Sequence, residues 1–191
     1  MKIEYNKGKN ISPVAFMFAC PGKKEQAAGR VVAGATGKNL NTLLSILAES
    51  ENEKVRALFP SGDRYDYLIT NSSDIVHYPA LDKTSLPSKK EYSDEANLSR
   101  LYTELKNIKY VIAFGAQAKD VSRLVDNKYQ LQNASPRPVF ITSLPHLSLL
   151  ALNQISEDIN GERIERGDKE ATHKRLTVVA KMLTDNIKDL L

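Results

Sequence analysis

An apolar run, a glycine-bearing loop and a leucine repeat follow one another between residues 14 and 44, and together they constrain the fold most. The run Val14–Cys20 is flanked by Pro13 and by Pro21-Gly22, which is typical of a strand buried on both faces. A loop and a leucine repeat at helical spacing come next: Gly29, Gly34 and Gly37, then Leu40, Leu43, Leu44 and Leu47. In open α/β sheets, ligands bind where such loops leave the carboxyl ends of strands. Because glycines let backbone N–H groups approach a ligand closely, we expect a binding site beside this loop.

Further apolar runs alternate with helical patterns along the rest of the chain. We predict three more strands, at Tyr65–Ser72, Tyr110–Phe114 and Pro138–Thr142. The predicted helices run from Gly37 to near Glu51, over 94–106, from Ala118 to Val125, and over 168–191 at the C-terminal end. This alternation predicts an α/β protein, a three-layer α/β/α fold with a central four-stranded parallel sheet. We interpret residues 1–12 as an N-terminal arm or short edge element, residues 74–90 as a loop, and 1–191 as a single domain.

The composition restricts the kinds of site and partner. Lysine and arginine exceed aspartate and glutamate by 27 − 23 = 4, which permits a polyanionic partner without requiring one. The single cysteine, Cys20, excludes a disulfide framework, a multi-cysteine metal site and an iron–sulfur cluster within the chain. No apolar stretch reaches the ~18 residues of a membrane span, and no signal peptide is recognisable. We therefore expect a cytoplasmic monomer that needs no cofactor or metal.

Polar residues directly follow the predicted strands. Asn71 follows the second strand, Gln117 the third, and His146 and Ser148 the fourth. In a parallel sheet these positions share one edge, beside the glycine loop. The sequence therefore predicts a pocket that presents an amide, an imidazole and backbone donors to one ligand.

Four motif regions, in order, resemble the uracil-DNA glycosylase superfamily. They are P-G-x-x-E from Pro21, G-R-x-x-x-G-x-x-G-x-x-L from Gly29, the pair Thr70-Asn71, and His146-Leu147-Ser148 in place of a His-Pro-Ser motif. The nearest resemblance is to the bacterial and archaeal family that carries an iron–sulfur cluster. It implies a parallel four-stranded α/β/α fold and the excision of a base from DNA.

The resemblance also implies roles for individual residues. Asn71 would read the edge of a flipped-out base through its amide, which offers both a donor and an acceptor. His146 would hydrogen-bond a base carbonyl and stabilise the departing anion. Ser148, Lys23 and the Pro21-Gly22 backbone would hold DNA phosphates.

The chain departs from the family pattern at three points. Ala19 stands where the family has an acidic residue, so we name Glu25 and Asp74 as candidates to activate water. The cluster cysteines are absent, and Val32 stands where the relatives have an aromatic ring that stacks on uracil. With Ala19, Cys20, Val32 and Asn71 forming the base pocket, we expect a bulkier modified pyrimidine than uracil. Hydroxymethylated or glucosylated cytosine of phage DNA is one hypothesis, with phage defence as the purpose.

Other interpretations are open at this stage. The chain could be a DNA-binding relative that has lost catalysis, as Ala19 suggests, or an enzyme that acts on free nucleosides. Asn71 could simply satisfy backbone groups at a strand end, and Cys20 is interpreted as a small buried residue rather than a nucleophile. No role is assigned to His77 or His173. The leading prediction is a monofunctional DNA glycosylase, because no lysine is placed to form a Schiff base.

Overall fold

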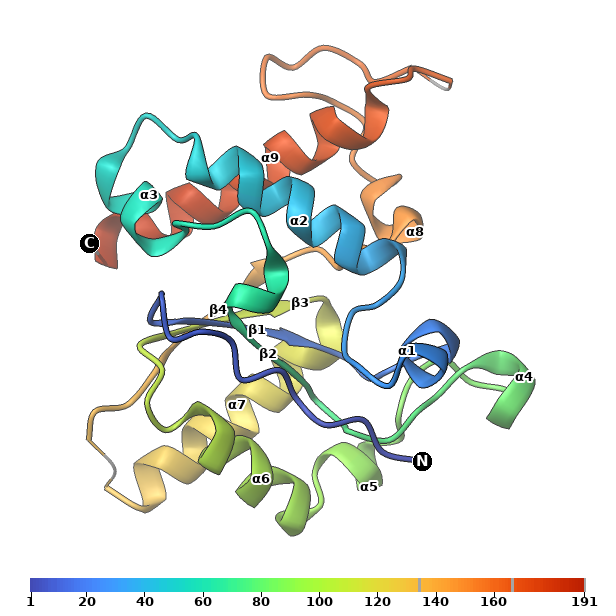
Figure 1. Ribbon diagram of the computed structural model, residues 1–191, viewed down its shortest axis with the longest axis vertical. Helices are drawn as coiled ribbons and strands as arrows, with labels where there is room; N and C mark the ends of the chain where they lie inside the picture. Colours follow the sequence, from blue (N-terminus) through green and yellow to red (C-terminus); the bar gives the residue numbers. More distant parts are fainter. Residues whose placement is uncertain (134, 166, 191) are drawn as a thin grey trace.

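A single parallel sheet forms the centre of the protein, as seen in the computed structural model, which describes residues 1–133, 135–165 and 167–190 (Figure 1). Its strands lie in the order β2-β1-β3-β4. They span Val14–Phe18 (β1), Leu68–Asn71 (β2), Tyr110–Phe114 (β3) and Val139–Leu144 (β4), and every pairing is parallel. The predicted four-stranded α/β/α fold is confirmed.

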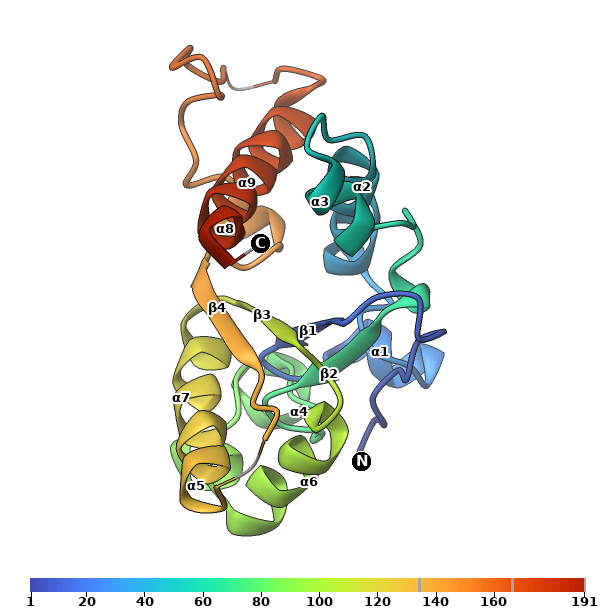
Figure 2. The same ribbon diagram turned by 90° about the vertical axis from the view of Figure 1, so that its left-hand side faces the viewer.

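Helices cover both faces of the sheet. In Figures 1 and 2, α2, α3, α8 and α9 lie on one face, and α5, α6 and α7 on the other. The helices are α1 (Lys23–Ala28), α2 (Ala35–Ala48), α3 (Glu53–Leu58), α4 (Pro79–Asp82), α5 (Lys89–Tyr92), α6 (Glu95–Leu105), α7 (Ala116–Leu131), α8 (Leu149–Leu152) and α9 (Ala171–Ile187). None of the described helices is both long and apolar enough to cross a membrane.

The two central strands are continuously apolar because both of their faces are covered. All five residues of β1 and of β3 are buried. Side chains alternate across the sheet, so Phe16 and Phe18 join the core under α2 and α9, whereas Ala15 and Met17 join the core under α6 and α7. The β1–β2 register pairs Phe18 with Asn71, which brings the ends of these strands side by side.

Several boundaries differ from the predicted ones. The second strand begins at Leu68 rather than Tyr65, because Arg64–Asp66 form a 3₁₀ turn in which the Asp63 side chain accepts a hydrogen bond from the Tyr65 N–H. The first strand ends at Phe18, two residues before Cys20. The fourth extends to Leu144, because its pairing with β3 continues past an irregularity in register.

The connecting segments hold more structure than the sequence patterns indicate. The long loop after β1 contains α1, and the predicted loop at 74–90 contains α4 and the first residues of α5. The N-terminal arm lies along the outer edge of β2, with isolated antiparallel bridges from Asn6 to Ile69 and from Lys2 to Ile75. The predicted helix at 168–191 begins later, at Ala171, and continues as a 3₁₀ turn to Leu190. Residue 191 lies outside the described residues.

Candidate active site

A cavity of about 170 Å³ opens at the carboxyl edge of the sheet. Its lining combines strand ends with the loop after β1 and the start of α2: Phe18, Cys20, Gly22, Glu25, Val32, Thr36, Asn71 and His146. In Figure 1 this is the side of the sheet on which α1, α4 and α8 lie. The structure thus brings together six residues that the sequence singled out, namely Cys20, Gly22, Glu25, Val32, Asn71 and His146. We call this cavity the edge pocket.

Asn71 ends β2 and contributes an amide with unused hydrogen-bonding capacity. The residue is 4% exposed, and its Nδ2 is buried without a hydrogen-bond partner among the described residues. Leaving such a donor unpaired costs about 1–3 kcal/mol. An asparagine at a strand end often hydrogen-bonds nearby backbone groups. The side-chain N–H groups of Asn71 do not. A polar ligand in the edge pocket could accept the hydrogen bonds that this amide does not make within the protein.

His146 lies between β4 and α8, and its hydrogen bond fixes its tautomer. The Ser148 backbone N–H donates to Nδ1 over 3.0 Å, so the neutral ring carries its proton on Nε2. Burial lowers the pKa of His146 below its usual 6.5, because the charged ring would lose hydration. The ring meets Phe18 edge-on, with centroids 5.8 Å apart. His146 is therefore held as a neutral N–H donor beside the pocket.

Glu25 holds the loop around the pocket through both carboxylate oxygens. Its Oε2 accepts from the Gly22 N–H over 3.1 Å and its Oε1 from the Gly34 N–H over 3.2 Å. Gly37 permits the tight return of this loop, because a Cβ there would lie 1.7 Å from the Val32 carbonyl oxygen. Val32 itself has φ +43°, which is unusual for a β-branched residue. The pocket wall is thus built around a carboxylate in fixed orientation.

The remaining predicted site residues lie outside the lining of the edge pocket. Asp74 pairs with Lys2 at 3.1 Å and borders a different cavity, so only Glu25 of the two water-activating candidates reaches the pocket. Ala19 accepts the Ser73 N–H through its backbone, and Pro21 accepts that of His77. Exposed Lys23 begins α1, directly after the lining residue Gly22. Ser148 caps α8 by accepting the Ala151 N–H.

Sequence reasoning missed two lining residues, Phe18 and Thr36. Phe18 supplies an aromatic ring that is 2% exposed and stacked on Phe114 at 5.2 Å. An aromatic wall is therefore present although Val32 replaces the expected ring. Strand pairing could have indicated Phe18: it lies directly beside Asn71 on the neighbouring strand, so both side chains point to the same face of the sheet. Thr36 lies in the first turn of α2, where only the folded loop brings it to the pocket.

Cys20 lines the pocket as an unreactive thiol. Burial, followed by the nearby carboxylates of Asp82, Glu25 and Glu91, raises its pKa to about 12. Because only the thiolate attacks, alkylation by iodoacetamide at pH 8 should be at least about 100-fold slower in the folded protein than in urea. Mass spectrometry of timed samples measures both rates. Equal rates would show that the thiol is neither buried nor shielded by these carboxylates.

Other polar groups and cavities lie apart from the edge pocket. His77, expected in a loop without a role, is 7% exposed; its Nδ1 contacts Asp82, and its Nε2 lies 3.2 Å from Glu91. His77 therefore links α4 to α5.

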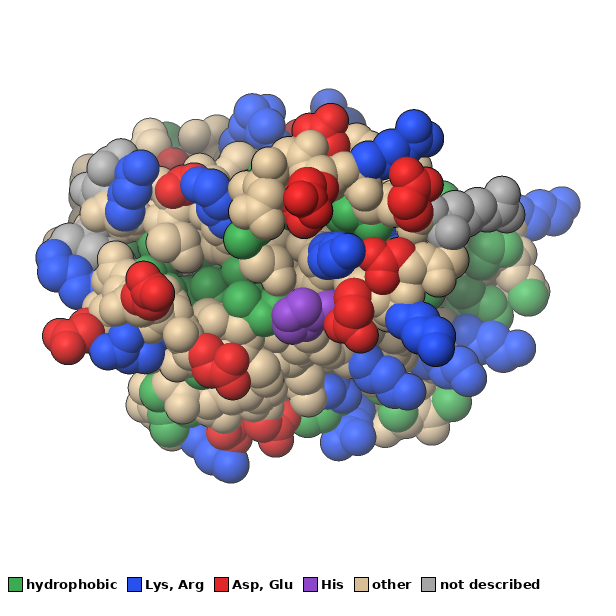
Figure 3. Space-filling model, turned by 90° about the horizontal axis from the view of Figure 1, so that it is seen from above, with side chains coloured by type: hydrophobic (Ala, Val, Ile, Leu, Met, Phe, Trp, Pro, Cys, Tyr) green, Lys and Arg blue, Asp and Glu red, His purple; other side chains and the backbone are tan. Residues whose placement is uncertain are grey.

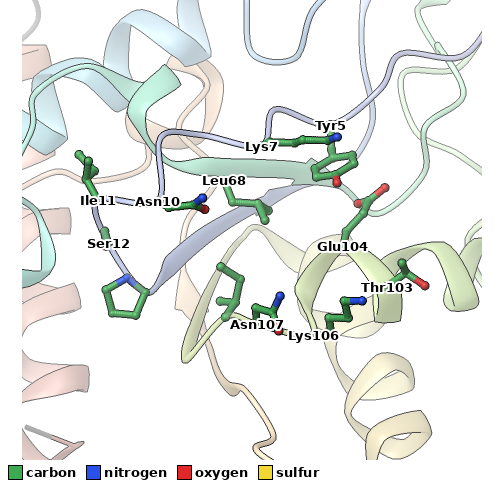
Figure 4. Close-up of a pocket in the computed structure, with 12 residues that line it drawn as sticks. Tyr5, Lys7, Asn10, Ile11, Ser12, Leu68, Thr103, Glu104, Lys106 and Asn107 are labelled. Carbon is green, nitrogen blue, oxygen red and sulfur yellow. The ribbon is translucent and has the colours of Figure 1, made fainter.

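A cavity of about 530 Å³ lies at the opposite edge of the sheet, between the N-terminal arm and the end of α6 (Figure 4). Within the described ranges, no three His, Cys, Asp or Glu side chains form a group that could hold a metal ion.

Two exposed lysines lie next to the pocket in the sequence of α1. Viewed from above, Lys and Arg side chains stand at several places on the surface, including the side on which α1 and α4 lie in Figure 1, and Asp and Glu side chains lie among them (Figure 3). Lys23 and Lys24 of α1 are exposed and have no carboxylate partner in the described part of the chain. Such unpaired cations are suited to contact a polyanion.

Comparison with known proteins leaves the geometry of this site as the guide to function. A scan against protein-family models and a search of curated protein sequences found no match to this chain.

Proposed function

We propose that the protein is a monofunctional DNA glycosylase that flips a pyrimidine into the edge pocket and hydrolyses its N-glycosidic bond. The observation that carries the proposal is that two hydrogen-bond donors without a partner among the described residues line one cavity. They are the Nδ2 of Asn71 and the Nε2–H of His146. A pyrimidine presents carbonyl oxygens at its edge, which accept hydrogen bonds from such donors. Base flipping is needed because the glycosidic bond is inaccessible inside the stack.

The tautomer of His146 supports stabilisation of the leaving base. As the glycosidic bond breaks, its electron pair moves onto the pyrimidine, and negative charge develops on ring nitrogen and carbonyl oxygen. An N–H donor aimed at that oxygen favours the transition state over the ground state. Because Nδ1 already accepts from Ser148, Nε2–H is the group free for this role.

Glu25 is suited to the water-dependent half of the reaction. It supplies the carboxylate among the described residues that line the pocket. Its two backbone hydrogen bonds hold it in place, while a carboxylate keeps further lone pairs for a water molecule. The same negative charge would stabilise the positive sugar that remains when the base leaves. No lysine lines the pocket in the described part of the chain, which favours direct hydrolysis over a Schiff base.

The size of the pocket favours one six-membered ring. Its volume is about 170 Å³, and an engineered cavity of about 150 Å³ in another protein holds benzene. Uracil and cytosine, with or without a small 5-substituent, suit this space. A glucosylated base would have to leave its hexose in the opening of the pocket.

The surroundings of the pocket support duplex DNA as the partner. Unpaired Lys23 and Lys24 lie beside it on α1. Leu149 and Leu150, three and four residues after the lining residue His146, are 49% and 79% exposed. Apolar side chains of this kind can enter the base stack and take the place of an extruded nucleotide. Release of a free base from labelled DNA is the experiment that tests the proposal.

The rate of base release should fall at acidic pH as His146 becomes protonated; this fall is the acid limb of the pH–rate profile. Protonated Nδ1 cannot accept the Ser148 N–H, and the lowered pKa of His146 means that the neutral ring persists below pH 6.5. The single-turnover rate should therefore stay constant down to pH 6.5 and fall to half at a lower pH. A pH–rate profile measures this, with His146→Gln expected to lack that limb. A half-point above pH 6.5 would contradict the buried, neutral donor.

A further inference from the structure

One face of α6 holds the end of β2. Asn97, Arg100 and Glu104 lie three and four residues apart on this helix, so their side chains share a face. Their partners are Thr70, Asn71 and Ser72. The apolar side chains Leu101 and Leu105 instead enter the core between α6, α7 and the sheet. This polar face is thus in direct contact with the residue that contributes the amide to the edge pocket.

Arg100 makes the central contacts. Its Nη2 donates to the backbone oxygen of Asn71 over 2.9 Å, and its Nη1 donates to the Thr70 hydroxyl over 3.2 Å. The same Nη1 lies 2.8 Å from both carboxylate oxygens of Glu104. Thr70 in turn donates to Glu104 over 2.6 Å. The guanidinium fork therefore joins the helix to two consecutive strand residues, with little freedom to rotate.

Asn97 completes the arrangement. Its Oδ1 accepts from Arg100 Nη2 over 2.8 Å, and its Nδ2 donates to the Ser72 backbone oxygen over 2.7 Å. The N-terminal arm bonds to the outer edge of β2 at Ile69 and beyond its end at Asp74, whereas the Asn71 carbonyl between them accepts from Arg100. The side chains of α6 thus take the backbone acceptors beside the pocket that the arm leaves unpaired.

The ion pair is shielded from solvent. The side chains of Arg100 and Glu104 are 21% and 6% exposed. Figure 4 shows Glu104 at the border of the cavity beneath the N-terminal arm, near Tyr5. A shielded ion pair is weak evidence for a role in stability, since an apolar pair of similar volume often stabilises as well. Its geometry suggests positioning instead.

We propose that Arg100, held by Glu104, is a positioning residue that sets the Asn71 amide in the edge pocket. This inference rests on the proposed glycosylase function. The Asn71 side chain has no hydrogen bond that fixes its orientation from the Nδ2 side. Its placement therefore depends on the backbone to which it is attached, and Arg100 holds that backbone. A small displacement of a reacting or binding group can cost a large factor in rate.

The test replaces both charges together, so that no unpaired charge is left buried. Arg100→Gln/Glu104→Gln should lower the single-turnover rate of base release by at least about tenfold. The matched control is Lys181→Gln/Asp185→Asn, which removes another pair with the same spacing, on α9, and should change the rate less than about twofold. The urea midpoints of all variants establish that they are folded under assay conditions. If the double substitution unfolds the protein, Arg100→Lys replaces it, since one ammonium cannot span Asn71 and Glu104 as the fork does.

A double-mutant cycle separates positioning from general damage. In an Asn71→Ala background, the change at 100 and 104 should lower the rate less than about twofold, because the amide that it positions is gone. The same loss in both backgrounds would overturn the inference, as would full activity of the substituted protein. Absence of base release by the wild-type protein would instead refute the proposed function itself.

Discussion

Replacing His146 with alanine should lower the single-turnover rate of base release by about 100- to 1000-fold. The substitution removes the Nε2–H that the hydrogen bond from Ser148 to Nδ1 leaves free. A single donor aimed at charge that develops in the transition state carries an effect of this size when water is excluded. Binding of the substrate should change less, because the ground-state carbonyl carries less negative charge.

Two companion variants make the result specific for His146. His173→Ala should retain full activity, since His173 is an exposed residue of α9. His146→Gln keeps an N–H donor at similar reach and should recover part of the loss. The rate is measured with enzyme in excess over a labelled oligonucleotide, by alkaline cleavage at abasic sites. Equal losses in the alanine and glutamine variants would indicate that the ring matters for packing against Phe18 rather than for donation.

Replacing Asn71 with leucine should reduce specific base release to a small residual single-turnover rate while leaving the folded state as stable as before, or more stable. Nδ2 of Asn71 is buried without a partner among the described residues. Removing such an amide relieves a desolvation cost of about 1–3 kcal/mol. A structural asparagine would behave in the opposite way. Lost activity with preserved stability is the expected signature of a residue kept for ligand recognition.

Asn39 provides the matched control for stability. It is also buried, at 8% exposed, but its Nδ2 donates to the Leu147 backbone oxygen over 2.8 Å. Asn39→Leu should lower the free energy of unfolding by about 1–3 kcal/mol, because that carbonyl is then left unpaired. Urea denaturation measures both variants. A comparable loss of stability in Asn71→Leu would show that the amide serves the fold.

The sequence predicts the sheet and the edge at which the pocket lies for one physical reason. Strands buried on both faces are continuously apolar, so Val14–Phe18 and Tyr110–Phe114 are visible as runs. Parallel pairing then places residues that follow different strands at one edge. Asn71 and His146 meet at one cavity for this reason, although 75 residues (146 − 71) separate them.

The details that the sequence does not predict depend on contacts between distant segments. Glu25 and Asp74 are equal candidates along the chain, but the fold ties Glu25 to the glycine loop and Asp74 to Lys2 of the arm. The contact of Arg100 with the Asn71 backbone likewise forms only when α6 packs beside β2. Short helices such as α4 and α5, each four residues long, are too brief to show a periodic pattern.

Base release from labelled DNA tests the central claim most directly. Uracil, 5-hydroxymethylcytosine and its glucosylated form are compared in duplex and single-stranded oligonucleotides, with His146→Ala and Asn71→Leu as negative controls. The account predicts that the wild-type protein frees one of these pyrimidines, and that both variants lose this activity although they remain folded. Salt-dependent DNA binding without release of any base would contradict catalysis and leave a binding protein. Turnover of free nucleosides with indifference to DNA would contradict the role assigned to the polynucleotide.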